Sequence, residues 1–438
     1  MIEFKISDFM VPHRVLFWRW NLWKNQYESR DRQRGLQWEL LSGLLDHCFT
    51  RVPYYRKLFE SLGLKRSDFN SLEDLTYIPI LNKDILLDFH QDFRSRDFIK
   101  YRPREIRTSG TTGTPLRVYW DLASNILELT CIWRHFSWSG YRLGEPFLDI
   151  RSVLFHEPEG YRWNWKCRGL EVSSDMIDAS NIESYAALLR RFHIKLWRGH
   201  PHSIDLFCRL LSEAGIENVR PKYVFTSSEA LLENQRHFIQ TWTGVPVCDN
   251  YGLKEHNVMI CQCPAGGYHI ASEYGIVEII KGDGTPAEPG EEGRIIATGL
   301  HNKAFPLLRY DTGDYAIHSE AHCTCGKTLP LVKRISGRID DRILTSKGRW
   351  VSGLHFAFFF LQGIRMAQLV QARSHSLDVY LVPTKDYQDE IAFTLSHELK
   401  KKLGKSMEIN IHLVPEIPYP SHGKFKFVVN KLRDRFDG

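Results

Sequence analysis

Eight consecutive residues rich in hydroxyl groups and glycine have the composition of a phosphate-binding loop. They follow a strand-like run and are Thr108, Ser109, Gly110, Thr111, Thr112, Gly113, Thr114 and Pro115. Glycine permits tight turns and close approach, so backbone N–H groups and hydroxyls can donate to a polyphosphate. The order of a Walker loop, G-x-x-x-x-G-K-[ST], is absent, which disfavours ordinary P-loop chemistry. Composition alone favours a plain surface turn, so the phosphate interpretation depends on the motifs that accompany it.

A second group of residues carries donor atoms that suit zinc. Cys261-x-Cys263 and Cys323-x-Cys325 lie on either side of a strand-rich segment, and His269 follows Cys263 by six residues. Thiolates and imidazole form tetrahedral zinc sites, and the glycine after Cys325 permits a tight turn. We expect Cys263, His269, Cys323 and Cys325 to be the ligands, with Cys261 as the alternate. The other interpretation is a set of reduced thiols without a metal.

Patterns of apolar residues indicate which elements position these groups. Residues 1–104 are mainly helical in periodicity, and from about 105 to 335 short β-rich runs alternate with helical stretches, which predicts a largely parallel, covered sheet. Between 276 and 318 the pattern changes to that of a β-meander or barrel edge. The run from Tyr223 to Leu231 looks like a strand ending in a polar turn, where an open α/β sheet places its ligand.

A boundary in the segment RISGRIDDRIL divides the chain into two predicted domains. Residues 1–337 would form a large N-terminal domain with mixed sheets and helices, and residues 338–438 a small α+β domain. The predicted fold class is therefore α/β, and the length of 438 residues is ample for two cores.

Composition bounds the function. The chain has 43% hydrophobic and 25% charged residues, as ordinary globular proteins do. No apolar run approaches the roughly 20 residues that span a bilayer, the N-terminal residues lack the apolar core of a signal peptide, and the nine cysteines suit a reducing compartment. We expect a cytoplasmic protein. A net charge of +6 spread over this length is too dilute to indicate nucleic-acid binding.

Further segments follow the hydroxyl-rich loop in a characteristic order. They are Asn250-Tyr251-Gly252-Leu253-Lys254-Glu255, Leu308-Arg309-Tyr310-Asp311-Thr312-Gly313-Asp314, Gly337-Arg338-Ile339-Asp340-Asp341 and Ser421-His422-Gly423-Lys424. Together they resemble the motifs of the adenylate-forming superfamily, most closely its phenylacetate-CoA ligase-like branch with CapK-like relatives. The resemblance spans residues 108–424. Leu116 stands where many relatives have a lysine, a departure that suits this branch.

The resemblance implies roles for the matched residues. Glu255 would help to hold Mg²⁺, Asp314 would bind the ribose hydroxyls, and Lys424 and Arg338 would act in catalysis, with Arg338 also contacting the nucleotide. Asp340 would be the hinge of a mobile C-terminal domain. The residues that would bind ATP or AMP besides these are Thr108, Ser109, Gly110, Thr111, Thr112, Gly113, Ser227, Ser228, Glu229, Asn250, Tyr251 and Gly252.

The implied reaction is ATP-dependent activation of a carboxylic acid as an acyl-AMP, followed by transfer to a thiol, by default that of coenzyme A. Magnesium and a lysine cation would lower the barrier because the attack brings anions together. An amine acceptor, as in polysaccharide or secondary-metabolite biosynthesis, stays open, and so does a relative that binds nucleotide without turnover. A zinc-stabilised nucleic-acid binder is disfavoured, and an assembly of two copies is compatible with the sequence.

Overall fold

A computed structural model provides the structure of the chain. It describes residues 20–107, 116–151, 159–165, 167–338, 343–346, 348, 350–351, 354, 363–384, 387–418 and 427–432. Among these residues no helix is both long enough and apolar enough to cross a bilayer.

Helices dominate the first part of the described chain, as predicted. They are α3 (Arg30–Arg51), α4 (Pro53–Ser61) and α5 (Lys83–Asp88), with short 3-10 turns η1 (Arg66–Asp68), η2 (Glu73–Tyr77) and η3 (Phe98–Tyr101). The Ser29 side chain caps α3, and a proline begins α4, where its missing N–H costs no hydrogen bond. Their buried faces share one core with Leu307, Leu308 and Tyr310 of the later β-meander.

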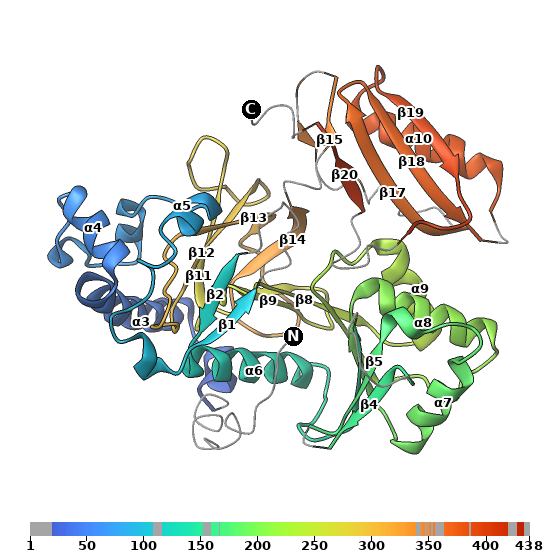
Figure 1. Cartoon of the computed structure of the whole chain (residues 1–438), viewed down its shortest axis with the longest axis horizontal. Coiled ribbons are helices and arrows are strands. Elements are labelled where there is room, and N and C mark those ends of the chain that lie inside the picture. Colours follow the sequence, from blue (N-terminus) through green and yellow to red (C-terminus); the bar gives the residue numbers. More distant parts are fainter. Residues whose placement is uncertain are drawn as a thin grey trace.

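Within the described residues, twelve strands form one large mixed sheet (Figure 1). Their order across the sheet is β11-β12-β13-β14-β10-β9-β8-β7-β6-β3-β5-β4. The strands are β3 (Phe147–Arg151), β4 (Tyr161–Asn164), β5 (Gly169–Ser173), β6 (Leu196–Gly199), β7 (Tyr223–Ser227), β8 (Val247–Gly252), β9 (Met259–Gln262), β10 (Tyr268–Ile270), β11 (Gly275–Ile280), β12 (Glu292–Gly299), β13 (Tyr310–Ser319) and β14 (Leu331–Arg338).

Only the middle of this sheet is parallel. The neighbours β5, β3, β6, β7 and β8 pair in parallel, and the other described pairs of the sheet are antiparallel. The prediction of a largely parallel sheet therefore holds for this middle segment alone. The physical reason is that a helix connects β5 to β6, β6 to β7 and β7 to β8, whereas the later strands follow one another through connections too short for a parallel crossover.

Helices cover both faces of the parallel segment. They are α6 (Leu122–Ser137), α7 (Ile182–Arg191), α8 (Pro201–Glu213) and α9 (Glu233–Thr243), with the 3-10 turn η4 (Ser174–Met176). Alternation along β6 explains the two faces: Trp197 packs on Phe207 of α8, whereas Leu196 joins the cluster around Phe136 of α6. The carboxyl ends of these strands are thereby held at one edge of a rigid layer.

A short antiparallel pair precedes α6. It consists of β1 (Arg104–Arg107) and β2 (Arg117–Trp120), whose end residues Arg107 and Arg117 lie opposite each other. The hydroxyl-rich segment 108–115 connects these strands and lies outside the described residues. The ladder nevertheless fixes the positions from which that segment begins and ends.

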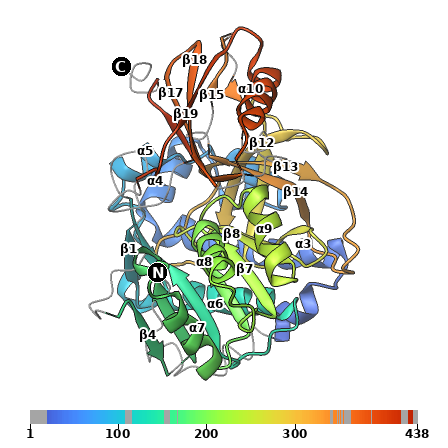
Figure 2. The same ribbon diagram turned by 90° about the vertical axis from the view of Figure 1, so that its right-hand side faces the viewer.

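The C-terminal part has a hydrophobic core of its own. Its elements are β15 (Ile343–Leu344), β16 (Trp350–Val351), β17 (Ile364–Arg373), β18 (Ser376–Pro383), α10 (Asp389–Leu403), β19 (Glu408–Leu413) and β20 (Val428–Asn430). Helix α10 covers a four-stranded sheet of order β19-β18-β17-β20, and the buried residues of this core all come from positions 343–428. In both views this part stands at one end of the molecule, beyond the large sheet (Figures 1 and 2).

Candidate nucleotide site and two metal-ligand clusters

Polar residues from two of the predicted motifs meet where β7 and β8 end. Ser227 and Asn250 are direct partners in this parallel pair, and the Thr226 hydroxyl donates to Asp249 Oδ1 at 2.8 Å. Burial raises the pKa of Asp249 to about 6, against the hydrogen bond from Thr226. Because carboxyl ends of neighbouring parallel strands share an edge, two segments more than twenty residues apart in sequence become one polar surface.

The Tyr251 and Asp314 motifs are joined directly. The Tyr251 hydroxyl donates to Asp314 Oδ2 at 2.7 Å, although the residues lie 63 positions apart. Asp314 is buried in β13 and lies opposite Arg338 of β14 in the backbone register. The structure thus brings together residues that the sequence motifs assign to adenine and to ribose.

The turn after β8 is tied to the strands that flank the hydroxyl-rich segment. The Lys254 ammonium donates to the carbonyl of Arg107, the last described residue before that segment, at 2.8 Å. The Trp120 indole N–H donates to the Lys254 carbonyl, and its ring stacks on buried His256 with centroids 3.9 Å apart. These contacts place Glu255, which is half-buried, beside the base of the segment.

Glu229 has neighbours that the sequence motifs did not indicate. It follows β7 directly after Ser228, whose φ of +75° lies in the left-handed region. Its Oε2 lies 2.5 Å from Nδ1 of His202, and its Oε1 lies 3.7 Å from Nδ1 of His200. We call His200, His202 and Glu229 the imidazole cluster.

Several predicted site residues lie outside what the structure describes. They are Thr108, Ser109, Gly110, Thr111, Thr112, Gly113, the hinge residue Asp340 and the terminal Lys424. For Arg338 the backbone is described and the side chain is not. The roles of these residues stay predictions.

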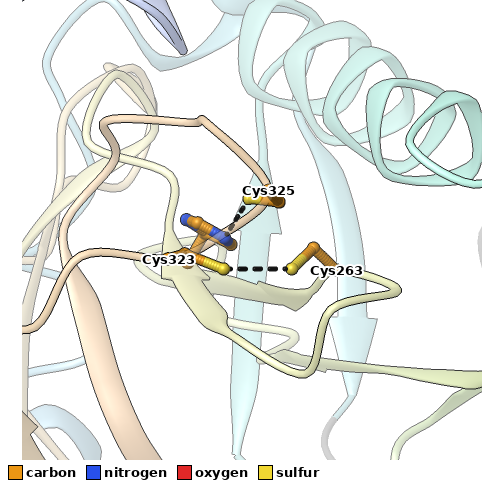
Figure 3. Close-up of side chains that lie close together, drawn as sticks. Cys263, Cys323 and Cys325 are labelled. Atoms are coloured by element: carbon orange, nitrogen blue, oxygen red, sulfur yellow. Dashed lines mark hydrogen bonds between the residues drawn. The ribbon is translucent and has the colours of Figure 1, made fainter.

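Four zinc donors predicted from the sequence converge on one point. The ligand atoms of Cys263, His269, Cys323 and Cys325 all lie within 4.8 Å of one another. Figure 3 shows two of the contacts: Cys263 Sγ to Cys323 Sγ at 3.5 Å, and Cys325 Sγ to His269 Nε2 at 3.2 Å. We call these four residues the thiolate cluster.

These distances fit a tetrahedral ion. Zinc bonds of about 2.3 Å to sulfur and about 2.1 Å to nitrogen place ligand atoms roughly 3.6–3.8 Å apart. Only glycine fits at position 267, because a Cβ there would lie 2.6 Å from Cys323 Sγ and 3.3 Å from His269 Nε2. The alternate, Cys261, is not in this set: it packs with Leu22 and Cys131 and accepts from Asn250 Nδ2.

The charge states at the thiolate cluster also favour a cation. Burial and then the positive charge of Lys327 lower the pKa of His269 to about 4, so its imidazole is neutral and able to ligate at pH 7. Burial, followed by the contact with Cys323, raises the pKa of Cys263 to about 12. Cys323 shifts the other way: against its partial burial, hydrogen bonds from the Cys325 backbone and side chain lower its pKa. One thiol of the pair is therefore the easier to ionise, and a divalent ion would compensate the charge of the others.

Helix α6 supports the thiolate cluster from behind. Its residue His135 donates from Nε2 to the Gln262 carbonyl at 2.8 Å, next to Cys263, and burial keeps this imidazole neutral by lowering its pKa to about 3. Trp138, at the end of the helix, meets the His269 ring edge to face with centroids 5.5 Å apart. Cys263 and His269 therefore rest against packed elements, whereas Cys323 and Cys325 lie half-buried in the segment between β13 and β14.

Three aromatic residues, Tyr161, Trp163 and Trp165, lie at the outermost strand of the sheet, away from the carboxyl ends of β7 and β8. Tyr161 and Trp163 belong to β4, the outermost strand, and Trp163 stacks on Phe192 with centroids 3.9 Å apart. Trp165 is 80% exposed. Packing accounts for Trp163, whereas Trp165 is exposed.

Sequence reasoning missed His200, His202, Trp120, His256 and the role of Lys254. The signal for the first two was present as Gly199-His200-Pro201-His202, two imidazoles around a proline just after a strand. The others carry no recognisable spacing, because their contacts join positions more than a hundred residues apart.

Comparisons with known proteins agree with these observations. Residues 343–431 match the model of the CapK C-terminal domain. The phenylacetate-coenzyme A ligase of Thermus thermophilus is 27% identical over 332 residues, covering 72% of each chain. That of Escherichia coli is 26% identical over 334 residues, covering 72% of this chain and 73% of that protein.

A solved structure confirms the predicted α/β fold class. A 2-hydroxyisobutyryl-CoA ligase, in its post-adenylation state, aligns with a TM-score of 0.74 at 17% identity over 94% of this chain and 93% of that chain. The relatives and the C-terminal family match support the resemblance that the motifs indicated: the chain is similar to the phenylacetate-CoA ligase-like branch of the adenylate-forming superfamily and to its CapK-like relatives.

Proposed function

We propose that the chain is an AMP-forming ligase that joins a carboxylic acid to the thiol of coenzyme A. In the first step a carboxylate oxygen attacks the α-phosphorus of ATP and pyrophosphate leaves. In the second step the thiol sulfur attacks the acyl carbon, AMP leaves and the thiol proton is released. The observation that carries the proposal is the hydrogen bond between Tyr251 and Asp314, which joins two nucleotide motifs at the carboxyl edge of the sheet.

The residues at that edge suit a nucleotide. Tyr251 offers a ring for adenine and Asp314 carboxylate oxygens for the ribose hydroxyls, while Ser227 and Asn250 add polar groups from the adjoining strands. The Asp314 carboxylate and the Asn250 amide already form hydrogen bonds within the protein, to Tyr251 and Cys261 respectively, so little side-chain conformational freedom would be lost on nucleotide binding.

Glu255 would hold magnesium in this proposal. Its carboxylate is a hard oxygen donor, half-buried in the turn that Lys254 ties to the base of the hydroxyl-rich segment. The bound ion would supply neutralisation of the phosphate charge. Lys424 would supply a second cation, and Arg338 would contact the nucleotide. Rotation about Asp340 would then remove Lys424 and admit the acceptor.

We further propose a structural zinc in the thiolate cluster and a cytoplasmic location. Four protein ligands close the shell, which leaves no position for a substrate. The nine cysteines are all free thiols, which suits a reducing compartment.

An amine acceptor remains the second candidate because residues 343–431 match the CapK-type domain, the part of the chain proposed to present the acceptor. Coenzyme A and a panel of amines, offered after adenylation, distinguish the two. Amide product with no thioester would establish the amine ligase.

The test is ATP–pyrophosphate exchange with Mg²⁺ across aryl, fatty and hydroxy acids, followed by addition of coenzyme A. We expect acid-dependent exchange and then thioester. Lys424→Ala should slow exchange at least about 100-fold and spare thiolysis of a supplied acyl-AMP. Lys401→Ala, whose side chain is 70% exposed, is the matched control and should behave as wild type. Equal loss of both half-reactions in Lys424→Ala would contradict the assignment, and ATP binding without exchange would favour a binding-only relative.

A further inference from the structure

We propose that the imidazole cluster, formed by His200, His202 and Glu229, is a second metal site for a divalent first-row transition ion. It is distinct from the thiolate cluster and from the magnesium proposed at Glu255, and it gives Glu229, which the resemblance places among the nucleotide-binding residues, the role of a metal ligand instead. Its ligand atoms all lie within 4.8 Å of one another. The inference goes beyond the proposed function and does not depend on it.

The backbone brings the three residues together. His200 and His202 lie at the junction of β6 and α8, and Glu229 follows β7. Gly199, the last residue of β6, is the register partner of Thr226 in β7, so the two junctions emerge side by side at the carboxyl edge. A Cβ at Gly199 would lie 2.5 Å from the Ile150 carbonyl oxygen, so glycine permits the close strand approach here. Two of the ligands therefore stand at the start of α8, and the third stands in the bend that follows β7.

The distances suit a small ion. Bonds of about 2.1 Å place neighbouring ligand atoms roughly 3.0–3.4 Å apart. Nδ1 of His200 lies 3.7 Å from Glu229 Oε1, and Nδ1 of His202 lies 2.5 Å from Glu229 Oε2. To bind an ion, the His200–Glu229 distance would shorten slightly and the His202–Glu229 distance would lengthen. The hydrogen bond between His202 and Glu229 would then be replaced by a bond from each residue to the metal. The side chains are only 10–14% exposed, so such an ion would be largely shielded from solvent.

Ser203 provides the partner that a metal-ligating histidine needs. Its Oγ lies 2.9 Å from Nε2 of His202, the ring nitrogen that faces away from Glu229. Without metal, Nδ1–H donates to Glu229 and Nε2 accepts from the hydroxyl. With metal, the proton sits on Nε2 and is donated to Ser203, which frees the Nδ1 lone pair. A hydrogen bond between a histidine and a glutamate would account for His202 alone. It does not account for His200, whose imidazole also faces the Glu229 carboxylate, and a metal ion between the three side chains accounts for both.

The donor set selects the class of ion. Two imidazoles and one carboxylate suit zinc, iron(II), cobalt(II) or manganese(II), whereas magnesium prefers oxygen ligands alone. Three protein ligands leave positions open, as in sites that take water or an exogenous oxygen. The cluster would therefore hold its ion in an incomplete shell, unlike the closed thiolate shell.

The test is a cobalt(II) titration of the full-length protein carrying zinc in its thiolate cluster, without ATP or acid. We expect one further equivalent of cobalt, with the ligand-field spectrum of nitrogen and oxygen donors and no added thiolate charge-transfer band. His200→Ala and His202→Ala should each weaken this binding at least about ten-fold. His397→Ala, a histidine whose side chain is 70% exposed on α10, is the control and should bind as wild type does.

Absence of a further equivalent in wild type, or unchanged affinity in both histidine variants, would overturn the proposal. Anomalous X-ray diffraction from cobalt-soaked wild-type crystals gives a second readout that does not depend on the folding of a variant. A peak among the three side chains is expected, and full cobalt binding with peaks only elsewhere would refute the site. Because ATP is absent throughout, failure here is distinguishable from failure of the ligase proposal.

Discussion

The thiolate cluster and the imidazole cluster differ in donors, completeness and place. The first gathers three sulfurs and one nitrogen from the turn after β9, from β10 and from the segment before β14, on the antiparallel side of the sheet. The second gathers two nitrogens and a carboxylate at the carboxyl ends of two parallel strands. Soft, complete shells hold a metal permanently, whereas harder, incomplete shells leave room for exchange and for ligands.

The supports of the two clusters differ as well. Behind the thiolate cluster, α6 contributes neutral buried imidazole and aromatic contacts. Beside the imidazole cluster lies the polar edge that carries Ser227 and Asn250. The two clusters therefore differ in their place on the sheet and in the number of ligands, and the following experiments test that separation.

Removing a thiolate ligand should have the largest effect. Cys323→Ser leaves an incomplete shell among buried thiols, so we expect loss of zinc and a fall of about 4 kcal/mol in the free energy of unfolding. Metal analysis and urea unfolding measure both quantities. Cys167→Ser, at a half-buried cysteine outside the cluster, is the control. Wild-type stability in Cys323→Ser would show that the thiols are unligated.

A half-buried carboxyl on α6 tests the support behind that cluster. Tyr274 donates to Glu128 at 2.5 Å, yet burial raises the pKa of Glu128 from 4.5 to about 7. The folded chain then binds this proton more tightly than the unfolded chain, so its stabilising contribution is complete below pH 4.5 and is lost as the pH rises through 7.

Glu128→Gln should remove this dependence. Relative to wild type, the variant should gain up to about 3 kcal/mol in free energy of unfolding between pH 4.5 and pH 8, because one pKa unit corresponds to about 1.4 kcal/mol. Urea unfolding at pH 4.5, 6 and 8 measures the difference. Parallel pH profiles for the two proteins would mean that Glu128 is ionised in the folded chain.

Loss of the serine behind His202 should act on the imidazole cluster alone. Ser203→Ala removes the acceptor at Nε2, and we expect cobalt affinity there to fall about ten-fold, with the zinc of the thiolate cluster retained. Ser212→Ala, at an exposed position of the same helix, is the control. If Ser203→Ala also released zinc, the two clusters would not be independent.

The smallest effect is expected at the nucleotide edge. Tyr251→Phe keeps the ring and removes the hydrogen bond to Asp314, which should weaken AMP binding about five-fold, or about 1 kcal/mol. Calorimetry measures the dissociation constant, with Tyr27→Phe, at a half-exposed tyrosine, as control. Unchanged affinity would mean that the hydrogen bond from Tyr251 to Asp314 does not contribute to nucleotide binding.

The zinc donors show what the spacing of cysteines in the sequence can predict and what it cannot. Two C-x-C pairs and one histidine identified the type of site, and Cys263 was preferred over Cys261 without a geometric reason. The structure supplies that reason: Cys261 lies within β9 and faces apolar neighbours, whereas Cys263 lies past the strand in the turn closed by Gly266 N–H to Cys263 O. Whether a residue falls inside a strand or just beyond it depends on pairing that spacing does not encode.

The sequence by itself determined the fold class, the order of the nucleotide motifs and the kinds of donor atom, because these depend on local periodicity, turn chemistry and residue type. Only the tertiary structure decided which side chains meet. His200 and Glu229 are 29 positions apart and Tyr251 and Asp314 are 63 apart, and each pair is joined by strand order and register. Register is set by packing of the whole sheet, and a shift of one residue in β8 or β13 would turn Tyr251 or Asp314 to the opposite face.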